Sequence, residues 1–167
     1  MNGRWDVLSC GGCVTKGIEK NIDVDMVYLD TNLLMALLCP EPETDWVMGW
    51  LATSDGLELV SSPWCRTELA SALAIKERTK QLSRKEVAIA SQKGLAILAS
   101  TRCEPIETSD FDEAAVLCSQ ASSNLRAPDA LHLSLAKRVG CTTIATMDVV
   151  LRKAAPKMGL KLVNFRK

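Results

Sequence analysis

Short apolar runs alternate along the chain with longer helical patterns. The first run, residues 27–29, ends in the carboxylate of Asp30, and an apolar helical stretch at residues 33–38 follows at once. A strand inside a parallel sheet is hydrophobic on both faces because helices cover both sides. We therefore expect Asp30 at the carboxyl end of a buried strand, which is the edge where open α/β sheets bind ligands.

The same alternation continues to the end of the chain. It predicts further strands at residues 57–60, 103–106, 142–145 and 161–165. Between them it predicts helices at residues 46–52, 64–78, 83–99, from 109 onward, 129–139 and 148–157. Trp46, Val47 and Trp50 share one face of the first of these helices and are expected in the core. The pattern indicates one α/β domain, with a central, mostly parallel sheet of four to five strands flanked by helices.

Length and composition agree with a single globular domain. The chain has 167 residues, of which 47% are hydrophobic and 24% charged. No apolar run approaches the roughly 18 residues that a membrane span requires. Residues 1–25 have no hydrophobic period and no apolar core of a secretory signal, so we expect a flexible extension followed by a domain at 26–167 in a cytoplasmic protein.

The seven cysteines do not suggest a disulfide framework. Their number is odd and they are scattered through predicted helices and strands, as expected of small core residues in a reducing compartment. Cys10 and Cys13 have zinc or redox spacing. A zinc site needs about four ligands, and no second pair or nearby histidine is present, so a flexible leader is the favoured interpretation.

Charge is distributed unevenly although the formal net charge is zero. Residues 1–65 carry ten acids and three bases, whereas residues 114–167 carry two acids and nine bases. A basic half indicates a polyanionic partner, although a solvated surface can look the same. The candidate phosphate-binding side chains are Arg126, Lys137, Arg138, Arg152 and Lys153.

Four acids occupy equivalent places in the predicted fold. Asp30 and Asp148 follow strands, Glu68 lies in the early turns of a helix, and Asp129 lies in the first turn of a helix that begins with proline. Each alone could be a helix cap or a solvated residue. Gathered at one sheet edge they would repel each other, and Mg²⁺ or Mn²⁺ is the natural counter-charge because both ions prefer oxygen ligands and bridge to phosphate. Such an ion makes a bound water nucleophilic.

Four motifs in this order resemble the PIN-domain ribonucleases, especially the toxin half of VapBC-type (type II) toxin–antitoxin pairs. The resemblance covers residues 26–167, nearly everything except the leader. The motifs are Val27-Tyr-Leu-Asp-Thr-Asn32, Trp64-Cys-Arg-Thr-Glu-Leu-Ala70, Arg126-Ala-Pro-Asp-Ala-Leu-His132 and Ile144-Ala-Thr-Met-Asp148. The resemblance implies a PIN-like fold and metal-dependent endonucleolytic cleavage of RNA. The leader departs from the family pattern, which puts the start site in doubt but not the chemistry.

The same resemblance assigns roles to residues and partners. It implies that Asp30, Glu68, Asp129 and Asp148 hold Mg²⁺ or Mn²⁺ and form the catalytic cluster, supported by Asn32 and Thr146. It also implies a homodimer and a protein antitoxin whose C-terminal segment enters the site. His132, one turn after Asp129, is expected to pack on its helix rather than act as a general base, since a metal-bound water needs no histidine.

Two other functions remain open. Phosphohydrolases of the haloacid-dehalogenase type also carry an aspartate after the first strand, as a covalent nucleophile. They require a second aspartate two residues later, where this chain has Asn32. The other rival is a non-catalytic binding module that kept the fold; the presence of all four acids argues against it.

Overall fold

The computed structural model describes residues 25–165, so nearly all of the predicted extension at 1–25, including Cys10 and Cys13, lies outside the described part. Five strands form one sheet: β1 (Met26–Leu29), β2 (Glu58–Ser61), β3 (Arg102–Cys103), β4 (Thr143–Ala145) and β5 (Lys161–Leu162). Seven α-helices surround it: α1 (Thr31–Leu38), α2 (Thr44–Ala52), α3 (Pro63–Arg78), α4 (Arg84–Ala99), α5 (Thr108–Ser119), α6 (Ala127–Arg138) and α7 (Val149–Ala154). Two 3-10 helices, η1 (Ala121–Ser123) and η2 (Ala155–Met158), complete the described elements.

All neighbouring strands are parallel, in the order β3-β2-β1-β4-β5. The predicted α/β class and strand count are therefore confirmed. The order reverses between β1 and β4, since β2 and β3 lie on one side of β1 while β4 and β5 lie on the other. Such a reversal opens a crevice at the carboxyl ends of the two strands, where α/β proteins bind ligands.

Strand β1 lies at the centre because its side chains can be buried on both faces. Tyr28 points to one side and packs with Leu133 and Ile144. Val27 and Leu29 point to the other side and pack with Leu33 of α1. This alternation follows from the two-residue period of a strand, and it explains why the run is apolar throughout.

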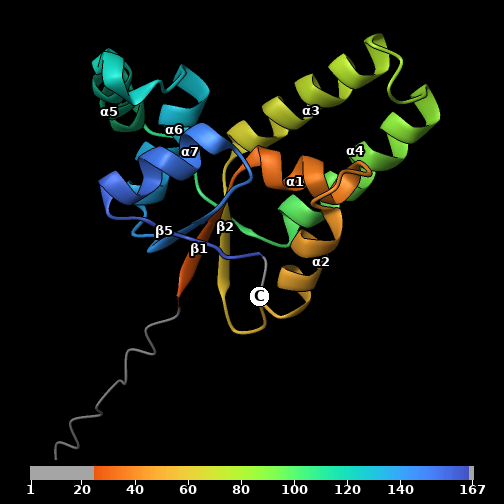
Figure 1. Ribbon diagram of the computed structural model, residues 1–167, viewed down its shortest axis with the longest axis horizontal. Coiled ribbons are helices and arrows are strands. Elements are labelled where there is room, and N and C mark those ends of the chain that lie inside the picture. Colours follow the sequence, from red (N-terminus) through yellow and green to blue (C-terminus); the bar gives the residue numbers. More distant parts are fainter. Residues whose placement is uncertain (1–24, 166–167) are drawn as a thin grey trace, which may run out of the picture.

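Helices cover both faces of the sheet. Helices α1 to α4 lie on one side, with α3 and α4 forming a long antiparallel pair, and α5, α6 and α7 lie on the other (Figure 1). Ser83 and Glu86 form the predicted capping box at the start of α4. Leu69 and Leu73 of α3 pack with Ala90 and Leu98 of α4 in a core of their own. The cavity described below lies where α1, α3 and α6 begin.

Several sequence predictions differ from the structure. The predicted strand at 103–106 is present only as the two-residue β3, and the predicted strand at 161–165 only as β5, which pairs with Thr143 and Ile144 of β4. The last helix ends at Ala154 and continues as η2, because Pro156 has no backbone N–H to extend an α-helix. Trp46 was expected in the core but is 36% exposed, whereas Val47, on the sheet-facing side of α2, is fully buried.

The structure of residues 25–165 also describes the state of the cysteines and the character of the helices. All five cysteines in this range are free, and three of them are buried in the core: Cys39, Cys65 and Cys141. None of the helices in the same range has the length and the apolar character needed to cross a membrane.

Candidate active site

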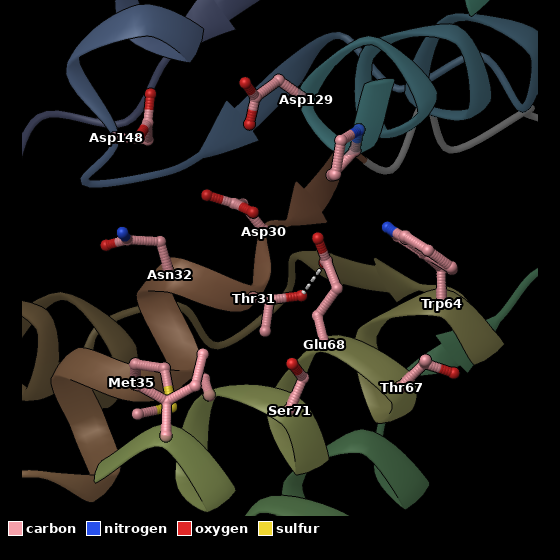
Figure 2. A pocket seen from close by; sticks show the side chains of 13 residues that line it. Asp30, Thr31, Asn32, Met35, Trp64, Thr67, Glu68, Ser71, Asp129 and Asp148 are labelled. Carbon is pink, nitrogen blue, oxygen red and sulfur yellow. Dashed lines mark hydrogen bonds between the residues drawn. The ribbon is translucent and has the colours of Figure 1, made fainter. Parts of the chain in front are cut away.

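The four predicted carboxylates line a single cavity of about 440 Å³ at the carboxyl edge of the sheet. Asp30 comes from the end of β1, Glu68 from α3, Asp129 from the first turn of α6 and Asp148 from the start of α7. Figure 2 shows Asp129 and Asp148 above Asp30, with Glu68 below and Asn32 to one side. Four chain segments that are far apart in sequence thus bring acids to the crevice between β1 and β4.

Thr146 connects the two strand-end acids. The backbone N–H of Asp30 donates to the carbonyl of Ala145 (3.1 Å), which continues the pairing of β1 with β4. The hydroxyl of Thr146, fully buried, donates to Oδ2 of Asp30 at 2.7 Å and accepts from the backbone N–H of Asp148 at 3.0 Å. One side chain therefore fixes the direction of one carboxylate and the backbone position of the other.

Asp148 and Asp129 are held by helix starts. Oδ1 of Asp148 accepts from the N–H groups of Val150 and Leu151, at 2.7 and 2.9 Å, as an N-cap of α7. Oδ2 of Asp129 accepts from the backbone N–H of Arg126 at 3.1 Å. Helix N-termini favour negative charge, so both acids are stabilised by the backbone, and each keeps its second oxygen as a potential ligand.

Glu68 is held by side chains. Its Oε2 accepts from the Thr31 hydroxyl at 2.6 Å and lies 2.6 Å from Nε2 of His132. Nε2 of His132 also lies 3.4 Å from Oδ1 of Asp30, and its Nδ1 lies 2.9 Å from the hydroxyl of Tyr28. The imidazole, 2% exposed, therefore connects two of the acids to the middle of the core.

Burial disfavours the charged forms of two acids. Desolvation raises the pKa of Asp30, which is 4% exposed, and outweighs the opposing effects of His132 and Thr146. Desolvation also raises the pKa of Asp129, assisted by the charges of Asp148 and Asp30. Carboxylates with raised pKa values in a cleft are typical of sites that a cation completes.

The His132–Glu68 pair has the opposite character. Burial lowers the pKa of His132, but the hydrogen bond to Glu68 and the charges of Asp30 and Glu68 raise it by more. Burial raises the pKa of Glu68, but His132 and then Thr31 lower it below its usual value. The pair is thus best described as imidazolium and carboxylate.

The donor set fits a hard divalent cation. Ligand atoms of Asp30, Glu68 and His132 lie within 4.8 Å of one another. Because Nε2 of His132 already contacts Oε2 of Glu68, the imidazole orients that carboxylate, and the available ligands are oxygens. Asp129 and Asp148 add further carboxylate oxygens from the same cavity. All-oxygen sets of this kind suit Mg²⁺ and Mn²⁺.

Sequence reasoning missed part of this network. His132 was expected only to pack on its helix, yet it is a buried partner of Glu68 and Asp30. Tyr28 and Thr31 belong to the first motif, whose residue types alone assign them no role. The signal was present in the spacing, since His132 lies three residues after Asp129 and so on the same helical face. Only the tertiary structure brings Glu68 to that face.

The predicted basic residues are placed differently from one another. Arg126 and Lys153 are exposed side chains on the elements that carry Asp129 and Asp148. Arg152 donates to the carbonyl of Thr146 at 3.1 Å, behind the site. Arg138 forms an ion pair with the buried Asp110 of α5 at 2.7 Å.

Two of these bases point away from the cavity. Arg138 follows Asp129 by nine residues, about half a turn around α6 from it. Lys137 lies 3.9 Å from Glu113 of α5, which is also away from the cavity. Lys153 lines a separate hollow with Asn124 and Lys157. A phosphate-binding role therefore finds support in the position of Arg126, which precedes the helix that carries Asp129, but not in Lys153, Lys137 or Arg138.

Comparison with known proteins agrees with this architecture. The family model of the PIN domain matches residues 27–157. Ribonuclease VapC35 of Mycobacterium tuberculosis is 28% identical over 146 residues, which cover 83% of this chain and 96% of that protein.

Solved structures show the same fold. The crystal structure of FitAcB from Neisseria gonorrhoeae matches with a TM-score of 0.63 and 24% identity, over 84% of this chain and 98% of the matched chain. VapC20 of Mycobacterium tuberculosis is described as a toxin that cleaves the sarcin-ricin loop. Its structure matches with a TM-score of 0.60 and 14% identity, over 77% of this chain and 94% of the VapC20 chain. Because the family model spans most of the chain and the fold agrees, this protein belongs to the PIN domain family.

Proposed function

We propose that this protein is a metal-dependent endoribonuclease and the toxin of a type II toxin–antitoxin pair. The observation that carries the proposal is the cavity itself, because four carboxylates from four segments meet there and each has one oxygen fixed by the protein. Membership of the PIN family and similarity to a protein named as a ribonuclease support the same reaction class.

Mg²⁺ or Mn²⁺, held by Asp30, Glu68, Asp129 and Asp148, would supply an activated water and neutralise charge on the phosphate. The protein's own part is to fix the acids before substrate arrives. Thr146 holds Asp30, the start of α7 holds Asp148, and Asn32 lies at the cavity rim as a further polar contact. Preorganised ligands of this kind need no rearrangement during the reaction.

His132 and Thr31 have a supporting role in this proposal. They donate to the same oxygen of Glu68, Oε2, which leaves Oε1 to face the cavity. An imidazolium buried beside Glu68 and Asp30 also reduces the repulsion among the acids. Loss of such supporting partners typically costs 10- to 100-fold in metal affinity or activity.

The substrate in this proposal is an RNA strand bound through its phosphates. Arg126 is the base that we assign to this contact, because it is exposed at the start of the helix that presents Asp129. Contacts to phosphates fix position without reading sequence. The partners that we propose, a second copy of the chain and an antitoxin that covers the cavity, rest on the family resemblance.

The test is cleavage of a labelled single-stranded RNA by purified protein. We expect cleavage with Mg²⁺ or Mn²⁺, none after chelation, and none with Asp30→Asn. Because the nucleophile is water, products should carry no 2′,3′-cyclic phosphate, and a 2′-O-methyl group beside the scissile phosphate should not abolish cleavage. Asp112→Asn, an exposed acid on α5, is the matched control and should remain active.

Two results would overturn the proposal. Cleavage that persists in Asp30→Asn or in the presence of chelator would show that another site or a contaminant cuts the RNA. A folded protein that binds neither cation and cuts no RNA would favour a non-catalytic module. The haloacid-dehalogenase alternative has no support left, because Asn32 occupies the place of its second aspartate and the chain belongs to another family.

A further inference from the structure

Trp64 lies on α3 four residues before Glu68, so the two side chains are neighbours on one face of the helix. The indole ring packs against a small core between α5 and α6 that contains Ala114, Ala130 and Leu131. One edge of the same residue lines the cavity beside the carboxylates. Trp64 therefore connects the α5–α6 core to the candidate metal site.

The indole N–H of Trp64 is an unusual feature of this wall. Its nitrogen is buried and, among the side-chain nitrogens and oxygens of residues 25–165, it alone is both buried and without a hydrogen-bond partner. Proteins satisfy nearly all buried donors, and an exception calls for an explanation such as a catalytic role or an unseen ion. The indole N–H can donate a hydrogen bond but cannot accept one. An acceptor must therefore approach it if the N–H is to be satisfied.

Glu68 is the acceptor within reach. Figure 2 shows the Trp64 nitrogen on the side of the ring that faces Glu68. Burial raises the pKa of the Glu68 carboxyl, and His132, Thr31 and then the nearby indole N–H of Trp64 lower it. The indole is thus close enough to favour the charged carboxylate, although the present geometry makes no hydrogen bond. Thr31 and His132 both hold Oε2, at 2.6 Å each, so the carboxylate is turned toward them.

We propose that Trp64 is a positioning residue for the metal site, whose indole N–H donates to Glu68 when a divalent cation occupies the cavity. The terminal torsion of a glutamate is soft, so the carboxylate can rotate toward the indole N–H. Three donors, from α1, α3 and α6, then fix the direction of Glu68. The inference rests on the proposed function, since it requires the cation that the four acids would hold.

The first test is a titration of the native protein with Mg²⁺ alone, observed by ¹H–¹⁵N NMR. The chain has four tryptophans, and the indole signal of Trp64 is assigned by its loss in Trp64→Phe. We expect this indole proton to move downfield as Mg²⁺ saturates the site, together with the backbone amides of Asp30 and Thr146. An indole signal that stays in place while those amides move would overturn the proposal.

The second test is Mn²⁺ affinity measured by calorimetry. Trp64→Phe keeps the aromatic packing and removes the N–H, and we expect binding roughly 10- to 100-fold weaker, as for other partners that orient metal ligands. Trp50→Phe is the control, because Trp50 packs edge-on against Phe165 away from the acids. Equal Mn²⁺ affinity in folded Trp64→Phe and in the native protein would also overturn the proposal.

The outcomes separate this inference from the function on which it rests. If the native protein binds neither Mg²⁺ nor Mn²⁺, the proposed metal site is wrong, and the role of Trp64 is wrong with it. If the native protein binds and only the Trp64 results fail, the metal site stands and the positioning role alone is refuted. If Trp64→Phe does not fold, the indole signal of Trp64 is assigned in the native protein by its through-space contacts with Ala130 and Leu131, and the Mg²⁺ titration then decides.

Discussion

Replacing Asp30 by Asn should stabilise the metal-free protein and abolish its response to Mg²⁺. The side chain is 4% exposed, and burial raises its pKa. A carboxyl with a raised pKa in the folded state destabilises the fold at pH values at which it is ionised. Asn keeps an acceptor for Thr146 and carries no charge, so the substitution removes this destabilisation and one ligand together.

The distances to neighbouring charges show why burial determines the direction in which the pKa of Asp30 shifts. Glu68 has a ligand oxygen within 4.8 Å of Asp30, a repulsion of roughly 3 kcal/mol at an effective dielectric constant of 20. The protonated His132, at 3.4 Å, attracts Asp30 by roughly 5 kcal/mol on the same basis. The attraction to His132 is the larger of these two effects on the pKa of Asp30, and burial outweighs it, so the desolvation cost must exceed the difference between them.

Thermal unfolding with and without cation is the assay. A ligand at 100 times its dissociation constant stabilises the folded state by about 2.7 kcal/mol. For a chain of 167 residues this corresponds to a rise in Tm of about 5–11 °C. We expect that rise in the native protein and in Asp112→Asn, and none in Asp30→Asn, whose metal-free Tm should already exceed that of the native protein.

Two results would refute this reasoning. If metal-free Asp30→Asn unfolds at a lower temperature than the native protein, attraction to His132 outweighs burial and the sign is wrong. If Mg²⁺ raises the Tm of the variant as much as that of the native protein, Asp30 is not a ligand.

Three further outcomes concern the rest of the molecule. The folded-state pKa of His132 is raised, so the stability that its protonated form contributes is complete below pH 6.5 and is lost as the pH rises through the folded-state pKa. The Tm of the metal-free native protein should fall over that pH range, and the Tm of His132→Gln should not. In chemical denaturation, Asp110→Ala should lower the free energy of unfolding by about 2–3 kcal/mol, because it breaks the ion pair of the buried Asp110 with Arg138 of α6. Glu113→Gln, at the exposed pair with Lys137, should lower it by less than about 0.5 kcal/mol. Gly94→Ala should lose about 1 kcal/mol, since its Cβ would lie 2.5 Å from a leucine methyl, while Gly49→Ala, with open space, should gain up to about 1.

The pattern of apolar positions predicted most of the fold, because each element is locally encoded. A short apolar run is typical of an interior parallel strand, and proline or a capping pair marks where α3 and α4 begin. The ends of elements were less predictable where pairing decides them. Residues 161–165 look like one strand, but only Lys161 and Leu162 pair with β4, so β5 ends at Leu162.

The same contrast holds for the site. The local pattern of the chain identifies the acids that follow strands and begin helices, and the parallel sheet brings such places to one edge. The contacts of Glu68 with His132 and of Thr146 with Asp30 join residues that are 64 and 116 positions apart, and they depend on how the elements pack. Sequence spacing carries no information about such pairs, because the packing of α3 against α6 and the pairing of β1 with β4 set their distances.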